Sequence, residues 1–347
     1  MKIIIDAMGG DNAPEEIVKG ALNCVKELNC EIILVGRGEE ILRIIERSGL
    51  GQLPKGLEIV DATEIIEIED DPASVIRTKK NSSLVVALNL LRDGRGDALV
   101  SAGSTGALLS GATLIVKRIR GIRRAALAPF IPNSGNGFIL IDCGANAECT
   151  PEYLLQFAHM GYCYAQDALS LASPRVGLLN IGGESTKGTP LQIDTYAHLE
   201  TAGKNGLINF AGNIEPTAAM KDACDVLVTD GYTGNIFLKT IEGTAKLVMS
   251  ELKTAYLKSF ITMISAMMVK KQIRALRQKM SADTIGGTAL LGISKPVIKA
   301  HGSSNATAIV SAARQAIKAA ESDTTSRLTA SLSINNANNI TKTVDKS

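Results

Sequence analysis

The most constraining feature of the sequence is a repeated alternation between short apolar runs and longer segments with helical periodicity. Eight runs are rich in Ile, Leu and Val with little polar alternation, which is typical of strands buried on both faces of a mainly parallel sheet. They are residues 2–6, 31–35, 57–60, 97–101, 137–142, 175–181, 207–212 and 225–231. Helical segments lie between them, at residues 13–28, 38–48, 81–92, 104–117, 151–171 and 233–252. This order predicts an α/β fold, with a doubly wound, mainly parallel sheet and helices on both faces.

Composition limits the classes of protein that fit. The 347 residues are 45% hydrophobic but only 3% aromatic, without Trp, so the predicted core is aliphatic. A net charge of +2 argues against a strongly basic nucleic-acid binder. The six cysteines form no CxxC pair and there are three histidines, so we expect buried free thiols in a reducing compartment, with no metal site and no disulfide framework.

The chain is expected to be cytoplasmic, because residues 1–6 run from Met into an apolar strand without a leader pattern. No stretch offers the roughly 18 uncharged apolar residues of a membrane span. We expect a single catalytic domain over residues 1–321, with a helical segment at 253–280, and a disordered tail over 322–347, which is rich in Ser, Thr and Asn.

Five loops that follow predicted strands combine Gly with small polar residues: 6–14, 101–111, 142–146, 180–190 and 229–235. Ligands of such sheets bind beyond the carboxyl ends of the strands, and glycine-rich turns before helices form anion sites. Any one loop is more often an ordinary turn, whereas five together favour a shared ligand cleft. Nucleotide and serine-hydrolase motifs are missing: there is no GxxxxGK[ST], no complete GxGxxG and no GxSxG.

Lys187 and Asn235 are the sharpest candidates for chemistry. Lys187 lies between glycines after a predicted strand, where it can hold a phosphate or polarise a carbonyl, although a solvated lysine fits the pattern equally well. The Asn235 amide can donate to an oxyanion, and a helix cap is the somewhat favoured alternative.

Further candidates for substrate binding follow from the same loops. The residues at 101–106 can cradle phosphate through hydroxyl and backbone N–H groups, and the other candidates end strands or follow them. They are Ser101, Gly103, Ser104, Thr105, Gly106, Asp142, Asn146, Asp230 and His301. The acidic residues can equally hold turns, as we expect for Asp6, and a lone histidine is more often structural.

Residues 253–280 contain apolar side chains at helical spacing, flanked by lysines and arginines. An apolar helix face ringed by cations suits contact with anionic lipid, and a core or dimer-interface helix is an equally open alternative. The apolar candidates for membrane contact are Tyr256, Phe260, Met263, Ile264, Met267 and Met268.

Together these segments resemble the bacterial phosphate acyltransferase family, also called acyl-ACP:phosphate transacylase. The resemblance covers about residues 1–321 and is carried by IIIDAMGGDNAP, PASVIRTKKNSSL, SAGSTGALLSG, DCGAN, GGESTKG, TDGYTGN and KAHGSSN. One departure is mild: residues 182–184 read Gly-Gly-Glu where the family pattern has Gly-Glu-Glu.

The resemblance implies a fold similar to the isocitrate and isopropylmalate dehydrogenases without a nucleotide cofactor. It implies transfer of an acyl group from acyl carrier protein to inorganic phosphate, with Lys187 and Asn235 at the positions thought to be catalytic. It also implies a homodimer, peripheral association with the inner face of the cell membrane, and delivery of acyl-phosphate to a membrane glycerol-3-phosphate acyltransferase for phospholipid synthesis. The basic run at 117–124 is a candidate dock for the acidic carrier protein, although a solvated patch is favoured.

Two other functions stay open. A NAD-dependent dehydrogenase on a similar fold would need a dinucleotide fingerprint or an aspartate cluster for a metal, and neither pattern occurs. A non-catalytic scaffold recruited to the membrane would explain residues 253–280 but not the polar loops at the strand ends.

Overall fold

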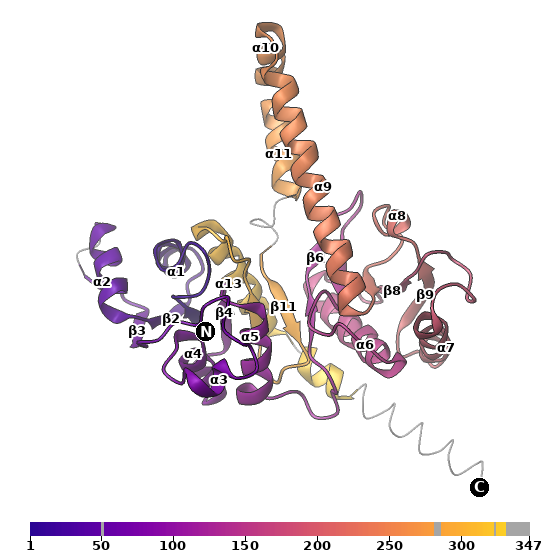
Figure 1. Ribbon diagram of the computed structural model, residues 1–347, viewed down its shortest axis with the longest axis horizontal. Coiled ribbons are helices and arrows are strands. Elements are labelled where there is room, and N and C mark those ends of the chain that lie inside the picture. Colours follow the sequence, from indigo (N-terminus) through magenta and orange to yellow (C-terminus); the bar gives the residue numbers. More distant parts are fainter. Residues whose placement is uncertain (50–51, 281–285, 323, 331–347) are drawn as a thin grey trace.

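The strands of the protein form two sheets that stand side by side (Figure 1). The computed structural model describes residues 1–49, 52–280, 286–322 and 324–330. All eight predicted strands are present, and the prediction of a mainly parallel α/β fold is confirmed. The sequence pattern did not indicate that the strands divide between two sheets.

The first sheet has seven strands, five from residues 2–128 and two from residues 288–299. Its order is β3 (Leu57–Asp61), β2 (Glu31–Gly36), β1 (Lys2–Asp6), β4 (Ala98–Ser101), β12 (Val297–Lys299), β11 (Thr288–Leu291) and β5 (Ala126–Ala128). The first five strands run parallel, whereas β11 pairs antiparallel with both of its neighbours.

The second sheet has five strands, in the order β6 (Phe130–Ile131), β7 (Phe138–Ile141), β10 (Val226–Val228), β8 (Arg175–Leu179) and β9 (Asn209–Ile214). Only β6 is antiparallel to its neighbour. Because β7, β10 and β8 are parallel neighbours, the loops that follow them meet at one edge of this sheet.

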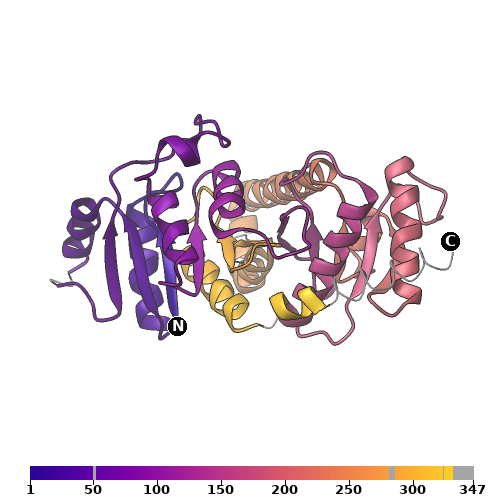
Figure 2. The same ribbon diagram turned by 90° about the horizontal axis from the view of Figure 1, so that it is seen from below.

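Helices lie on both sides of the sheets (Figure 2). They are α1 (Glu15–Glu27), α2 (Gly38–Arg47), α3 (Val75–Thr78), α4 (Ser83–Arg92), α5 (Thr105–Gly111) with a π-helical turn at Ala112–Val116, α6 (Pro151–Ala168), α7 (Pro190–Lys204), α8 (Pro216–Ala219) and α13 (Ala306–Glu321). Two clusters of buried aliphatic side chains, one on each side, draw members from both sheets, such as Ile3 with Ile139 and Ile4 with Leu140. The two sheets therefore share a continuous core.

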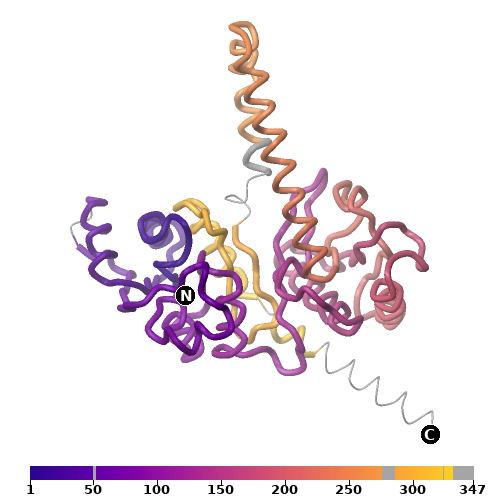
Figure 3. The backbone as a smooth tube through the Cα atoms, in the orientation of Figure 1, coloured from indigo at the N-terminus to yellow at the C-terminus, as the bar shows by residue number. Residues whose placement is uncertain are grey.

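A helical arm projects from this body. It consists of the outer part of α9 (Gly231–Leu257), α10 (Phe260–Met268) at the tip, and α11 (Lys270–Met280), which returns toward the body (Figure 3). The expected protruding helical segment is thus present. Within the described residues, no helix combines the length and the apolarity that crossing a bilayer requires.

Order continues beyond residue 321, in contrast to the expected disorder of the tail from 322. Residues 324–330 are helical, Leu328 is buried against the core, and Arg327 pairs with Asp167 of α6. Residues 331–347, the rest of that expected tail, lie outside the described residues.

Candidate functional site

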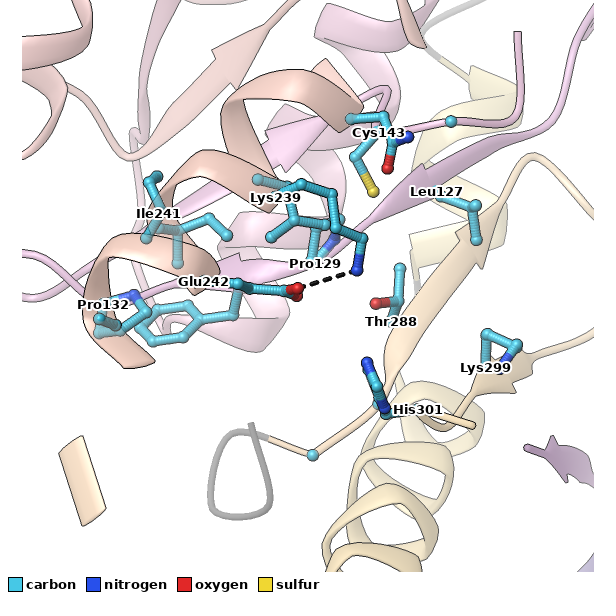
Figure 4. Close-up of a pocket in the computed structure, with 18 of the residues that line it drawn as sticks. Leu127, Pro129, Pro132, Cys143, Lys239, Ile241, Glu242, Thr288, Lys299 and His301 are labelled. Carbon is cyan, nitrogen blue, oxygen red and sulfur yellow. Dashed lines mark hydrogen bonds and ion pairs between the residues drawn. The ribbon is translucent and has the colours of Figure 1, made fainter. Parts of the chain in front are cut away.

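A cavity of about 720 Å³ lies between the two sheets. The first sheet contributes Thr105 at the start of α5, Thr288 of β11, Lys299 at the end of β12, and His301. The second sheet contributes the chain around β6, the turn after β7, and one face of α9 (Figure 4). A site at the carboxyl ends of strands from both sheets is where this architecture places ligands.

Polar and charged side chains line two facing sides of the cavity. On one side, α9 contributes Asn235, Lys239 and Glu242, and the Lys239 ammonium pairs with the Glu242 carboxylate at 2.8 Å. On the opposite side, His301 Nδ1 lies 2.9 Å from the Ser303 hydroxyl. Loss of hydration lowers the pKa of His301, and the positive charges of Lys239 and Lys299 add to this effect against the opposing charge of Glu242. The imidazole of His301 is therefore neutral at pH 7.

The remaining wall is apolar. Its side chains come from β5, β6, α8 and α9: Leu127, Pro129, Phe130, Ile131, Pro132, Met220, Leu238, Ile241 and Ala245. An apolar cavity with a few convergent polar groups is the usual form of a site for a small organic ligand.

The 101–106 loop is held in place by polar contacts behind the cavity. The Ser101 hydroxyl donates to Asp6 Oδ2 at 2.7 Å and accepts from the Gly103 N–H at 3.1 Å. The Ser104 hydroxyl caps α5 by accepting from the Ala107 N–H. Gly106 packs under Pro72, since a Cβ there would lie 2.7 Å from that ring. Of the candidates in this loop, Thr105 lines the cavity, and the others fix the backbone that carries it.

Asp142, Asn146 and Asp230 hold the loops of the second sheet. The buried Asp142 carboxylate accepts from the backbone N–H groups of Leu127, Cys143, Ala145 and Asn146 at 2.7–3.2 Å. The Asn146 amide donates to Asp142 and to the Ala125 carbonyl. Asp230 caps α9 by accepting from the Thr233 N–H and hydroxyl, each at 2.8 Å.

These contacts hold the two chain segments that lie next to Asn235. The loop that Asp142 holds contains Gly144 at φ 127°, and a Cβ on Gly144 would lie 3.7–3.8 Å from the Asn235 side chain. Asn235 in turn follows the helix start that Asp230 caps. The Asn235 side chain thus lies beside the Gly144 turn at the cavity wall.

Lys187 lies outside this wall. It is exposed on the loop after β8, where its N–H donates to the Glu184 carbonyl and its own carbonyl accepts from the Asn180 side chain at 3.0 Å. Its loop follows β8 at the same edge of the sheet as the loops of Asn146 and Asp230. The structure therefore brings the loops together, but it does not bring the Lys187 side chain into the cavity.

The sequence patterns did not indicate Lys239, Glu242 or Thr288 as site residues, nor Lys299. Lys299 ends a strand of three residues, and its side chain is only 9% exposed although it lines the cavity. A signal exists in the sequence, because a lysine that follows the apolar run Val297–Ile298 and precedes a polar loop is an unusual end for a buried strand.

The cysteine thiols are mostly buried. The six cysteines are free and five of them are buried, as predicted. Burial raises the pKa of Cys24, Cys149 and Cys224 to about 12, so these thiols stay protonated at neutral pH. In the described part of the chain, no group of three or more His, Cys, Asp or Glu side chains is arranged to hold a metal ion.

The outer surfaces of the arm and of the basic run are exposed. At the tip, Phe260, Met267 and Met268 are 74%, 75% and 80% exposed, Met263 and Ile264 are less so, and Tyr256 is half-buried. In the basic run, buried Ile119 and Ile122 anchor the chain while its lysine and arginines face solvent.

Comparison with known proteins shows the family to which the chain belongs. The family model described as "Fatty acid synthesis protein" matches residues 1–327. A phosphate acyltransferase of Oceanobacillus iheyensis is 43% identical over 333 residues, covering 96% of this chain and 97% of that protein. One from Clostridioides difficile is 45% identical over 319 residues, covering 92% of each chain.

Solved structures agree on the fold. A phosphotransacetylase from Streptococcus pyogenes matches with a TM-score of 0.61 at 20% identity, over 92% of this chain and 93% of that one. A branched-chain phosphotransacylase from Enterococcus faecalis matches with a TM-score of 0.57 at 16% identity, over 93% and 99%. With a family model over nearly all of its length and full-length relatives above 40% identity, this chain belongs to the phosphate acyltransferase family, and it is an enzyme of acyl transfer.

Proposed function

We propose that this enzyme transfers a fatty acyl group from acyl carrier protein to inorganic phosphate. The observation that carries the proposal is one cavity whose wall combines an amide, a hydroxyl and cations with a set of apolar side chains. The polar part suits an oxyanion and the apolar part suits an acyl chain.

The chemistry needs positioning more than it needs a strong base. A phosphate oxygen attacks the thioester carbonyl, a C–O bond forms, and the carbonyl oxygen becomes an oxyanion. When the tetrahedral intermediate collapses, the C–S bond breaks, acyl-phosphate leaves, and the carrier thiolate takes up a proton. The Asn235 amide donates to the oxyanion, the 101–106 loop with Thr105 holds phosphate, and neutral His301 can accept the phosphate proton.

Lys187 is proposed as the second oxyanion donor. Because its side chain lies outside the cavity wall, this role requires the 181–189 loop to move toward Asn235 when the donor binds. Glycines at 182, 183 and 188 give this loop backbone freedom, and Gly188 already stands at φ 97°.

Incubation of the purified protein with acyl-loaded carrier protein and phosphate tests the proposal against its rivals. Release of acyl-phosphate supports transacylation, and an absorbance change that depends on NAD supports the dehydrogenase alternative. Inertness in both assays supports a non-catalytic scaffold.

The arm is proposed to place the enzyme on the inner face of the cell membrane. Exposed apolar side chains at the tip, with lysines at 253, 258, 270 and 271 beside them, suit shallow insertion among anionic lipids. An enzyme at the membrane can pass acyl-phosphate directly to a membrane glycerol-3-phosphate acyltransferase. The proposed reaction itself uses no nucleotide cofactor.

A homodimer is proposed on the exposed face of α9. Tyr232, Ile236, Leu247 and Val248 are 50–66% exposed on one long helix, an unusual density of apolar surface for an isolated subunit. Sedimentation equilibrium checks this proposal. The wild type should sediment as a dimer and the double variant Ile236→Glu with Leu247→Glu as a monomer. A monomeric wild type would contradict the proposal.

A further inference from the structure

Lys299 lies at the point where three parallel strands of the first sheet end together. In the register of the sheet, Lys299 of β12 is opposite Ser101 of β4, and Ser101 is opposite Asp6 of β1. The 101–106 loop begins at Ser101. The lysine therefore sits directly beside the backbone that leads to Thr105.

The Lys299 ammonium is buried without a contacting counter-charge. Its Nζ donates to the Ala102 carbonyl at 3.2 Å and to the Ala300 carbonyl. Among the described residues, no carboxylate oxygen lies within 4 Å of it, so Asp6 and Asp11 act on it only at longer range. An ammonium has three N–H donors, and within the part of the chain that the structure describes two carbonyls leave one of them without an acceptor. A buried cation without a contacting anion is costly, which is typical of groups kept for a ligand.

The surroundings of Lys299 favour an anionic ligand. It lines the same cavity as Thr105, Asn235 and His301, and Lys239 across the cavity is already neutralised by Glu242 (Figure 4). An oxyanion at this wall would supply the missing counter-charge and accept the free N–H in a charge-assisted bond.

We propose that Lys299 is the cation that binds the phosphate oxygens of the acyl acceptor. The proposal rests on the proposed transacylation and adds the identity of the acceptor's charge partner. It gives the two lysines separate tasks: Lys299 holds phosphate inside the cavity, and Lys187 arrives with its loop to serve the thioester oxyanion.

A purely structural lysine would hold Ala102 in place but would not respond to phosphate, and pH separates the two roles. Burial lowers the pKa of Lys299 to about 8; the negative charges of Asp6 and Asp11 oppose this shift, while the positive charge of Lys239 adds to it. His301, which faces the same space, is neutral at this pH. As pH rises through about 8, the free enzyme loses the ammonium and, with it, affinity for phosphate.

The experiment compares Lys299→Met and Lys299→Arg with the wild type, and Lys295→Met serves as the matched control. Lys295 precedes the same strand at its other end and likewise donates to a backbone carbonyl, that of Leu91 at 2.7 Å, but it is not part of the cavity wall. Inorganic phosphate binding is measured by calorimetry without acyl donor, and KM values for phosphate and for acyl-loaded carrier protein are measured by acyl-phosphate release between pH 6.5 and 9.5.

Lys299→Met should weaken phosphate binding about ten- to hundredfold, the usual range for one charged hydrogen bond, with the KM for the acyl donor unchanged. Lys299→Arg should keep phosphate binding within about tenfold of the wild type and lose the decline above pH 8, because arginine stays charged. Lys295→Met should match the wild type throughout.

Wild-type phosphate affinity in folded Lys299→Met, or an unchanged alkaline decline in Lys299→Arg, would overturn the proposal. If thermal unfolding shows that Lys299→Met is not folded, the pH profile of Lys299→Arg decides alone. A wild type that binds phosphate but releases no acyl-phosphate would count against the transacylation and leave the binding role of Lys299 standing.

Discussion

Polar residues at the strand ends divide into those that face the cavity and those that hold the loops around it. Asn235, Thr105 and His301 belong to the first group. Asp142 and Asp230 belong to the second, because their carboxylate oxygens are occupied by N–H and hydroxyl donors of the chain itself. Loss of a residue from either group should lower activity, but only loss from the second should also lower stability.

Asp142→Asn should destabilise the fold. An amide presents one oxygen and an NH₂ group to backbone N–H donors that now meet a carboxylate, so at least two donors lose their acceptor. We expect a loss of about 2–4 kcal/mol in the free energy of unfolding, measured by urea denaturation at pH 7. Asp194→Asn on the exposed face of α7 is the control and should change stability by less than about 0.5 kcal/mol. Equal stability of the two variants would contradict the role given to Asp142.

Lys187→Ala should act on turnover without affecting folding. Its side chain is exposed and holds no other element, so the thermal midpoint should stay at the wild-type value. Loss of one positioned oxyanion donor typically lowers kcat by about 10²–10³-fold, which acyl-phosphate release measures directly. Lys204→Ala, which removes an exposed lysine of α7 that pairs with Glu200, should retain full activity. Near-normal turnover in Lys187→Ala would remove that residue from the mechanism.

Among the elements, the arm is unusual because it exposes its apolar side chains rather than burying them. α9 ends at Leu257, and Ser259 starts α10 by a capping box with Thr262, so the chain turns at the tip. This turn presents Phe260, Ile264, Met267 and Met268 outward from the body. No described element of the same chain covers them, so an outside surface must be their partner if they are to be desolvated.

Ile264→Asp combined with Met268→Asp should release the enzyme from anionic vesicles. Two carboxylates at the tip oppose both burial in the acyl region and attraction to negative headgroups. Flotation with vesicles that contain phosphatidylglycerol measures the bound fraction. Ala197→Asp with Thr201→Asp adds the same charge at the same spacing to exposed positions on α7, outside the arm, and should float like the wild type. Equal flotation of all three proteins would argue that the tip does not touch lipid.

At the scale of the whole molecule, the cavity exists because two sheets share one core. The chain passes from β5 in the first sheet to β6 in the second through Pro129, and both strands border the cavity. Next to this crossing lies the basic run, with Arg124 stacked 5.6 Å from the centre of the Tyr153 ring. A partner that docks there would stand at the joint between the two sheets.

Arg120→Glu with Arg123→Glu should weaken use of the acidic carrier protein. Charge reversal at a docking surface acts mainly on association, so we expect the KM for acyl-loaded carrier protein to rise about tenfold or more at low salt. The difference from the wild type should shrink as salt rises toward 0.5 M. Arg43→Glu with Arg47→Glu on α2 changes charge equally, far along the chain, and should not alter that KM. If Arg120→Glu with Arg123→Glu keeps the wild-type KM, the basic run is a solvated surface and does not dock the carrier protein.

The sequence by itself determined the class of the fold and the loops that surround the site. Residues 3–5, 32–35 and 98–100 are uninterrupted apolar runs, as strands covered on both faces require, and residues such as Pro151 mark helix starts locally. These signals are short-range, because periodicity and capping act within a few residues. Because these signals agree over most of the chain, they predict the α/β fold class and reveal the family resemblance.

Only the tertiary structure decided which side chains share the cavity. β5, β6, β11 and β12 have two to four residues each, too few for periodicity to show, and their pairing assigns them to two different sheets. That pairing brings Lys299 into a cavity wall with Asn235 of the other sheet, while Lys187 stays outside on its loop. Proximity between positions so distant along the chain comes from packing, and local sequence signals carry no information about it.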